Sequence, residues 1–177
     1  MAADRAPLDP LTSATVTIAW VIFANKPFYP LYVWWLVGNG VPASLGTLLA
    51  APFFLAIPFI ARSRPLIARF ALPLVGALDT IFETKLFGQG SGTELFLAPC
   101  IMLAALAFYP EEKWWQRSLA ALLFSAMVLQ HNHLGQALHL WSDKDLSTLF
   151  NLNTFAVASL MTFVALRYAG IGRPRSP

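Results

Sequence analysis

All three histidines of the chain lie within ten residues, in the segment QHNHLGQALH at 130–139. Imidazole nitrogens bind metals and cofactors and also make hydrogen bonds, so His131, His133 and His139 are candidates for chemistry. The sequence on both sides is apolar, with SLAALLFSAMVL before the segment and LW after it. Three interpretations follow: metal ligands, cofactor ligands, or polar residues at the end of a membrane helix.

Two carboxylates form a second candidate group. Asp79 and Glu83 in GALDTIFETKLF are four residues apart, which places both on one face of a helix. Glu94 follows GQGSGT, and its charge is explained by the start of the next helix. Asp79 is expected about two turns below a membrane surface, where a charge needs a partner. The expected partner is Lys26 in FANKPFYPLYVWW, near mid-membrane, with Lys85 as an alternative.

The composition identifies the class of protein that must position these groups. The chain has 177 residues, of which 57% are hydrophobic and 12% charged, and its mean hydropathy is +0.60. Soluble domains carry about 25% charged residues, so we expect an integral membrane protein. The net charge of +3 is small and dispersed, which argues against nucleic acid as a partner. The single cysteine, Cys100, lies in an apolar run and is interpreted as a buried thiol.

Hydrophobic runs separated by short polar connections predict an all-α bundle of six transmembrane helices. This domain would occupy 14–169, between a cytoplasmic tail at 1–13 and a basic cytoplasmic tail at 170–177. The first span carries Pro27 and Pro30. It is therefore either broken at Asn25-Lys26-Pro27, or it is an interfacial helix, which would leave five spans. The expected spans are 14–37, 43–61, 66–87, 94–110, 117–140 and 148–169.

Positive charge orients such a bundle, because lysine and arginine accumulate on the cytoplasmic side. Only Lys85 and Lys144 lie in or beside the odd-numbered connections. The distribution predicts both termini in the cytoplasm (N-in/C-in) and a multi-pass protein of a bacterial inner membrane. Nine basic residues lie in or beside the tails and even-numbered connections: Arg5, Arg62, Arg64, Arg69, Lys113, Arg117, Arg167, Arg173 and Arg175.

The predicted fifth span brings the histidines to the depth of the two carboxylates. At 100° per residue, Asn132, Gln136 and His139 share one stripe, and His131 and His133 flank it on opposite sides. The sixth span has its own stripe of small and polar residues, a pattern typical of helix-packing faces in lipid. That stripe consists of Ser147, Asn151, Thr154, Ala158 and Thr162.

Three uses of these groups remain open from the sequence. They could form a purely structural hydrogen-bond network, a small-molecule pocket or a metal site. Mixed imidazole and carboxylate ligands suit zinc, iron or manganese better than copper(I). Bis-histidine haem is disfavoured, because its ligands approach from opposite ring faces and no second helix carries a histidine. The candidate ligand-binding residues are Asp79, Glu83, Asn132, Gln136 and His139, and the candidate metal ligands are His131, His139, Glu83 and Asp79.

The segment FETKLFGQGSGTELFLAPCIMLAALAFYPEEKWW resembles the multi-span sensor regions of bacterial diguanylate and adenylate cyclases. Gly88, Gly90, Ser91 and Gly92 match the outer G-x-x-SG turn of those regions, and Pro99 matches their helix proline. Lys113 and Arg117 match their basic loop, and the likeness extends loosely over 43–169. Those regions normally precede a cytoplasmic catalytic domain, whereas this sequence stops at RYAGIGRPRSP. The resemblance implies a sensor module, either free-standing or working with a separate partner.

The sequence therefore favours a sensor or receptor-like membrane module that binds a small ligand or metal near the periplasmic face. It would act in the lipid bilayer, through a cytoplasmic or membrane signalling partner or as a homo-oligomer. A metal-dependent membrane enzyme using the same histidine and carboxylate cluster is one alternative. An accessory subunit of a larger membrane complex is the other.

Overall fold

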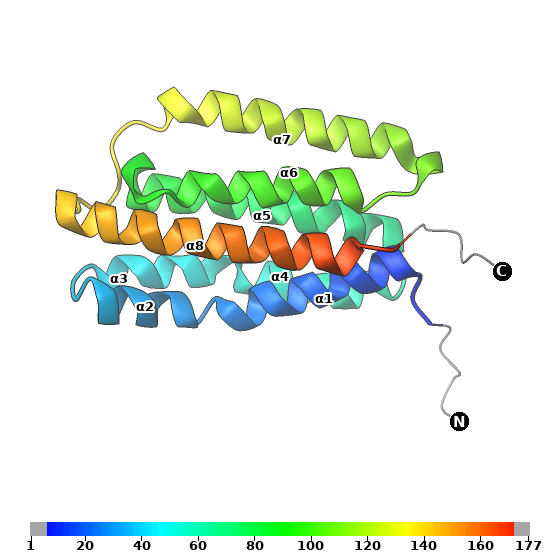
Figure 1. Cartoon of the computed structure of the whole chain (residues 1–177), viewed down its shortest axis with the longest axis horizontal. Coiled ribbons are helices and arrows are strands. Elements are labelled where there is room, and N and C mark those ends of the chain that lie inside the picture. Colours follow the sequence, from blue (N-terminus) through cyan, green and yellow to red (C-terminus); the bar gives the residue numbers. More distant parts are fainter. Residues whose placement is uncertain (1–6, 172–177) are drawn as a thin grey trace.

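The computed structural model describes residues 7–171, with the side chains of residues 131 and 132 outside that description. The described residues are mostly helical and contain no strand, which confirms the all-α class. Short 3₁₀ turns join several of the helices. The α-helices shown in Figure 1 are α1 (Pro10–Asn25), α2 (Phe28–Leu36), α3 (Val41–Ser44), α4 (Ala51–Ala61), α5 (Pro65–Phe87), α6 (Leu97–Leu106), α7 (Lys113–His133) and α8 (Asp143–Tyr168).

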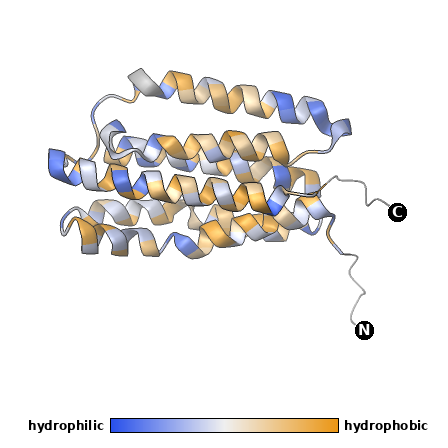
Figure 2. Ribbon diagram, in the orientation of Figure 1, coloured by the Kyte–Doolittle hydropathy of each residue, from blue (hydrophilic) through white to orange (hydrophobic). Residues whose placement is uncertain are grey.

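Several helices are long and apolar enough to cross a bilayer. Among the described residues, three meet that condition alone: Val41–Ala61, Pro65–Phe87 and Asp143–Tyr168. The pair Thr93–Leu106 and Pro110–Gln130, bent by 115°, meets it when the two are taken together and brings the number to four. Hydrophilic residues gather at the helix ends and hydrophobic ones in the middle (Figure 2). The chain is a membrane protein by the length and composition of these helices.

The first predicted span is broken at the predicted place. Helix α1 ends at Asn25, and α2 begins at Phe28 after Pro27. Proline has no N–H to continue the helical ladder. Lys26 still donates its N–H to Ile22 O (3.1 Å), so the ladder stops one residue before the proline. The Lys26 side chain therefore projects from the break between α1 and α2.

Helix α1 begins four residues earlier than the predicted boundary at residue 14. Asp9 is its N-cap and accepts a hydrogen bond from Thr12 N–H (3.0 Å), and Tyr109 donates its hydroxyl to the same carboxylate (3.0 Å). Burial raises the pKa of Asp9, but the hydrogen bonds from Thr12 and Tyr109 outweigh burial. They hold this pKa below its ordinary value of 3.8.

The predicted fifth span is too long at its end. Helix α7 ends at His133, and Gly135 follows with a φ of +64°, a left-handed conformation that suits glycine after a helix. Lys85 Nζ donates to Leu134 O and Gln136 O, both at 2.7 Å, and so satisfies carbonyls beyond the helix end. Residues 134–142 form an irregular connection. The prediction of a regular helix to residue 140 is therefore wrong.

Helix α8 begins five residues before the predicted boundary at 148, because Ser142 caps it by accepting from Asp145 N–H (3.2 Å). Its predicted packing stripe is also placed differently. The residues that α8 buries are Leu149, Asn153, Val157, Val164 and Tyr168. The predicted stripe of Ser147, Asn151, Thr154, Ala158 and Thr162 is exposed in this single chain.

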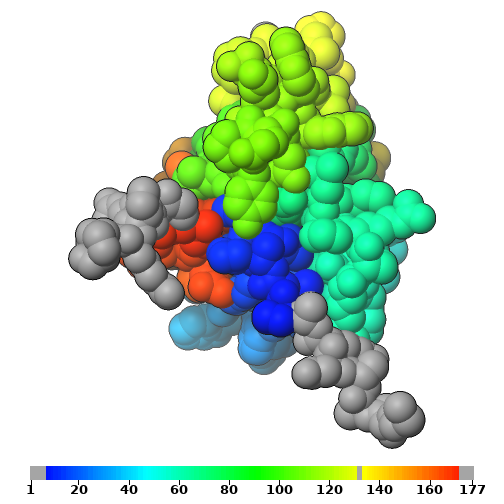
Figure 3. All heavy atoms as spheres, turned by 90° about the vertical axis from the view of Figure 1, so that its right-hand side faces the viewer, coloured from blue at the N-terminus to red at the C-terminus, as the bar shows by residue number. Residues whose placement is uncertain are grey.

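The start of α1 and the end of α8 meet at one end of the bundle. The hydroxyls of Thr15 and Tyr168 lie 3.0 Å apart, and Arg167 Nη2 reaches Thr17 Oγ1 at 3.3 Å. Figure 3 looks onto this end and shows the first turns of α1 between the end of α8 and the α4–α5 region. The first and last helices of the fold therefore share one end.

A buried arginine lies near the same end. Arg69 in α5 has 3% of its surface exposed and binds the Glu112 carboxylate through both terminal nitrogens, at 2.7 and 2.6 Å. The same guanidinium lies 5.0 Å from the ring centroid of Tyr109 and donates to Ala107 O at 3.2 Å. Arg69 is therefore more than an orienting charge, because it also ties α5 to the α6–α7 connection.

Candidate ligand site

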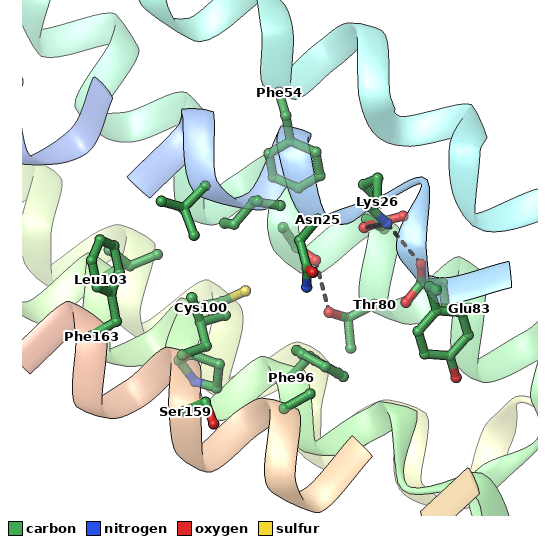
Figure 4. Close-up of a pocket in the computed structure, with 18 of the residues that line it drawn as sticks. Asn25, Lys26, Phe54, Thr80, Glu83, Phe96, Cys100, Leu103, Ser159 and Phe163 are labelled. Carbon is green, nitrogen blue, oxygen red and sulfur yellow. Dashed lines mark hydrogen bonds and ion pairs between the residues drawn. The ribbon is translucent and has the colours of Figure 1, made fainter. Parts of the chain in front are cut away.

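A cavity of about 590 Å³ lies within the bundle, between α1, α2, α4, α5, α6 and α8. Its volume falls within the usual range of small-molecule pockets, about 300–1,000 Å³. Most of its wall is apolar, as in other ligand pockets, and aromatic side chains such as Phe54, Phe96 and Phe163 contribute to it. Figure 4 shows these rings and the polar groups around the cavity.

A buried charge cluster forms one part of the wall. Lys26 Nζ binds Glu83 Oε1 at 2.7 Å and also binds Asp79 Oδ2. The side chains of Lys26, Asp79 and Glu83 are 9%, 9% and 12% exposed. The predicted pairing of Lys26 with Asp79 is confirmed, and the structure adds Glu83. The four-residue spacing on α5 aims both carboxylates at the α1–α2 break, where the lysine enters.

The cluster is unbalanced in charge. Lys26, Asp79 and Glu83 are the only charged side chains among the described residues that line the cavity, so two carboxylates face one ammonium. Asp79 Oδ1 is buried and has no hydrogen-bond partner among the described residues. A buried acceptor without a partner is costly. The cavity thus presents a carboxylate oxygen that can still accept a hydrogen bond.

Neutral groups extend the polar part of the cavity. Asn25 and Thr80 line it beside the charges, and Tyr29 contributes a phenol from α2. Thr80 donates its hydroxyl to Gly76 O (2.8 Å), within its own helix. The Lys26 ammonium also lies 5.7 Å from the centroid of the Phe54 ring, a distance typical of cation–π contacts. The polar residues are therefore concentrated around the α1–α2 break.

The predicted residues of the QHNHLGQALH segment lie elsewhere. Gln136 is exposed, and its carbonyl accepts from Lys85. The ring of His139 packs edge-on against Trp141 with 4.5 Å between ring centroids, and the backbone N–H of His139 donates to Leu86 O (3.3 Å). Neither residue lines the cavity. Because the helix ends at His133, the predicted stripe joining Asn132, Gln136 and His139 does not form.

Of the other two histidines, the structure describes the side chain of His133 but not that of His131. His133 is exposed, and its Nδ1 lies 2.7 Å from Leu129 O, within its own helix. The side chains of His131 and Asn132 fall outside the described part of the structure.

No metal site is assembled by the side chains that the structure describes. Among them, no group of three or more histidine, cysteine, aspartate and glutamate residues could hold a metal ion. Of the predicted ligands, Asp79 and Glu83 are bound to Lys26, and His139 packs on Trp141. A zinc, iron or manganese site that includes His131 stays a prediction from the sequence.

Other cavity residues were not candidates in the sequence analysis. Tyr29, Phe54 and Ser159 line the cavity from three different helices, and nothing in their local sequence distinguishes them from packing residues. Cys100, which was predicted to be a buried thiol, is buried and lines the same cavity. The usable signal was the Asn25-Lys26-Pro27 break, because a lysine beside a helix break in an apolar run requires buried counter-charges.

Comparison of the sequence with protein-family models and with curated proteins gives no match.

Proposed function

We propose that this chain is a sensor or receptor-like module of a bacterial inner membrane, which binds a small ligand in the cavity and signals through a separate partner. The observation that carries the proposal is the cavity itself, which combines an apolar wall with the Lys26–Asp79–Glu83 cluster. Charged groups inside a membrane domain are costly and typically mark functional sites. Here they line a space large enough for a small molecule.

The proposal includes six crossings with both termini in the cytoplasm. The broken pair α1–α2 supplies the first crossing, and α6 and α7 are counted as separate crossings because a marked bend divides them. An even number of crossings places the start of α1 and the end of α8 on the same side of the membrane, which agrees with their contact at one end of the bundle. The basic residues of the α4–α5 and α6–α7 connections support a cytoplasmic position for that end.

The test compares wild-type protein with a variant whose cavity is filled. Ser159 lines the cavity from α8, so Ser159→Trp places an indole at its wall. Leu166→Trp is the matched control, because Leu166 is on the same helix, is 71% exposed and does not line the cavity. Small molecules extracted from each purified protein are then identified by mass spectrometry.

We expect one compound at near-stoichiometric amount in wild type and in Leu166→Trp, and its loss from Ser159→Trp. Identical small-molecule content in all three proteins would contradict a ligand site in this cavity. Circular dichroism and gel filtration must show that the variants keep a helical, monodisperse state.

A specific observation also favours the accessory-subunit alternative. The exposed stripe on α8, from Ser147 to Thr162, presents small and polar residues to the lipid side of this single chain. Such stripes permit close helix contact in membranes. If the stripe is a contact face, Ala158→Trp should release a co-purifying protein that Leu166→Trp retains. Equal recovery of partner proteins from both variants would argue against this alternative.

A further inference from the structure

The mouth of the cavity opens on the side of the bundle. Among the lining residues, the exposed ones come from α1, α2 and α8; Val21 is 43% exposed and Phe155 75% exposed. The lining residues of α4, α5 and α6 are buried or half-buried, and Phe54, Leu72 and Leu103 are fully buried. Helices α1, α2 and α8 therefore form the rim, and α4, α5 and α6 form the floor.

This rim lies at the break between α1 and α2 and along the middle of α8, away from the ends of the bundle. Phe155 and Ser159 are central in α8, which extends from Asp143 to Tyr168. Exposed apolar side chains line the opening, including Val21 on α1 and Phe155 on α8. In a membrane this surface faces hydrocarbon, so a molecule that enters through the mouth must dissolve in the bilayer.

The interior gives such a molecule two different ends. Figure 4 shows Lys26 and Glu83 on one side of the cavity, and Leu103 and Phe163 on the other. A ligand that fills the space therefore needs a polar head and an apolar body. The head is specified by Asp79, whose side chain is 9% exposed and whose Oδ1 is buried without a partner among the described residues.

The charge count then selects among polar heads. Lys26 is already bound by both carboxylates, so its ammonium is engaged, and with both carboxylates ionised the cluster carries one surplus negative charge. A carboxylate or phosphate head would add to that surplus in a low-dielectric site. A hydroxyl head could donate to Asp79 Oδ1 but would leave the charge. An ammonium head donates a hydrogen bond and neutralises the surplus.

We propose that the cavity takes a membrane-soluble amine, a single aliphatic chain with a primary ammonium head that donates to Asp79 Oδ1. The ligand enters between α1 and α8, and its chain lies against the wall formed by Leu103 and Phe163. This inference rests on the proposed function, because it names the ligand class of the same cavity.

The test uses three probes with the same chain: dodecylamine, 1-dodecanol and dodecanoate. Each is radiolabelled and equilibrated at pH 7 with the protein in phosphatidylcholine nanodiscs, and partition into empty nanodiscs is subtracted. We expect dodecylamine to bind wild type about tenfold or more tightly than the other two, the effect of one charge-assisted hydrogen bond. Ser159→Trp should weaken the binding of all three probes.

Asp79→Asn removes the surplus charge and leaves the Lys26–Glu83 pair balanced, so the preference for dodecylamine over 1-dodecanol should disappear. Asp143→Asn is the control, because Asp143 is exposed in the first turn of α8 and does not line the cavity. It should keep the preference. The comparison of probes on wild type alone gives a result even if Asp79→Asn does not fold.

Equal binding of the three probes, or tighter binding of dodecanoate, would overturn the amine inference. If that binding were still lost in Ser159→Trp, the cavity would remain a ligand site and the proposed function would stand. Absence of saturable binding by every probe would also overturn the inference. The extraction experiment would then decide the proposed function separately.

Discussion

Replacement of Lys26 is the sharpest test of the charge cluster, because the three charged side chains are not equivalent. Lys26→Met removes the cation of the cluster and leaves Asp79 and Glu83 as two buried carboxylates four residues apart. Asp79→Asn leaves one ammonium and one carboxylate in contact. We therefore expect the lysine variant to be far less stable than either carboxylate variant, although each change removes one charge.

The magnitudes follow from burial. Removal of one partner from a buried ion pair costs about 3–5 kcal/mol, because the other charge is left uncompensated. Asp79→Asn should cost about 1 kcal/mol, since one hydrogen bond weakens while the surplus charge disappears. For a chain of this size, about 3 kcal/mol corresponds to a fall of about 6–12 °C in melting temperature. Tryptophan fluorescence during heating in mild detergent measures it.

The matched control is Lys144→Met, because Lys144 is exposed in the first turn of α8 and should change the melting temperature little. The double variant Lys26→Met with Asp79→Asn should recover part of the loss, and addition of Glu83→Gln should recover more. The reasoning is refuted if Lys26→Met melts like Lys144→Met, or if the carboxylate changes fail to rescue it.

Four further outcomes are expected. Asp9→Ala should cost about 1 kcal/mol of stability through loss of the α1 N-cap. Because the pKa of Asp9 is lowered in the folded protein, this stabilisation is present above pH 3.8 and is lost as the pH falls through the folded pKa. Melting curves of both proteins at pH 7 and pH 3 test this pH dependence. Arg69→Lys should cost about 2 kcal/mol of stability, since lysine cannot bind the Glu112 carboxylate through two nitrogens. Unfolding in urea or detergent measures this loss, and an unchanged free energy of unfolding would mean that the contact is unimportant. His139→Ala should cost about 1 kcal/mol by loss of its ring contact, with metal content by mass spectrometry equal to wild type; a loss of bound metal would instead support the histidine site. In a Cys100→Ala background, an impermeant thiol reagent on spheroplasts should label Lys144→Cys and not Arg64→Cys, and the reverse pattern would invert the topology.

The charge cluster could be predicted from the sequence, because it depends on the spacing of two residues along one helix and on the energetic cost of a buried charge. Asp79 and Glu83 share a helix face by spacing alone, and a lysine beside two prolines in an apolar run indicates a break with buried counter-charges. The break and the pairing of Lys26 with Asp79 are both present in the structure. What could not be predicted was which helices enclose a cavity, since that depends on contacts between segments far apart in the chain.

Two other predictions failed for physical reasons that the sequence pattern conceals. Gly135 was read as part of a helix, yet its left-handed conformation belongs to a helix end, and Lys85 from another helix satisfies the carbonyls there. The small-residue stripe of α8 has a pattern typical of helix-packing faces, but within this single chain it is exposed. In a membrane, lipid-facing and protein-facing surfaces are both apolar, so periodicity does not tell one side of a helix from the other.

The meeting of α1 and α8 has a mechanical consequence. The two helices are joined at one end by hydrogen bonds of Thr15 with Tyr168 and of Arg167 with Thr17, whereas the last turns of α1 and the middle of α8 both line the cavity. Because α1 and α8 are in contact at one end, the distance between them at the cavity changes when one helix tilts about that contact. Any change in the width of the cavity is thereby converted into a change of angle between the first and last helices.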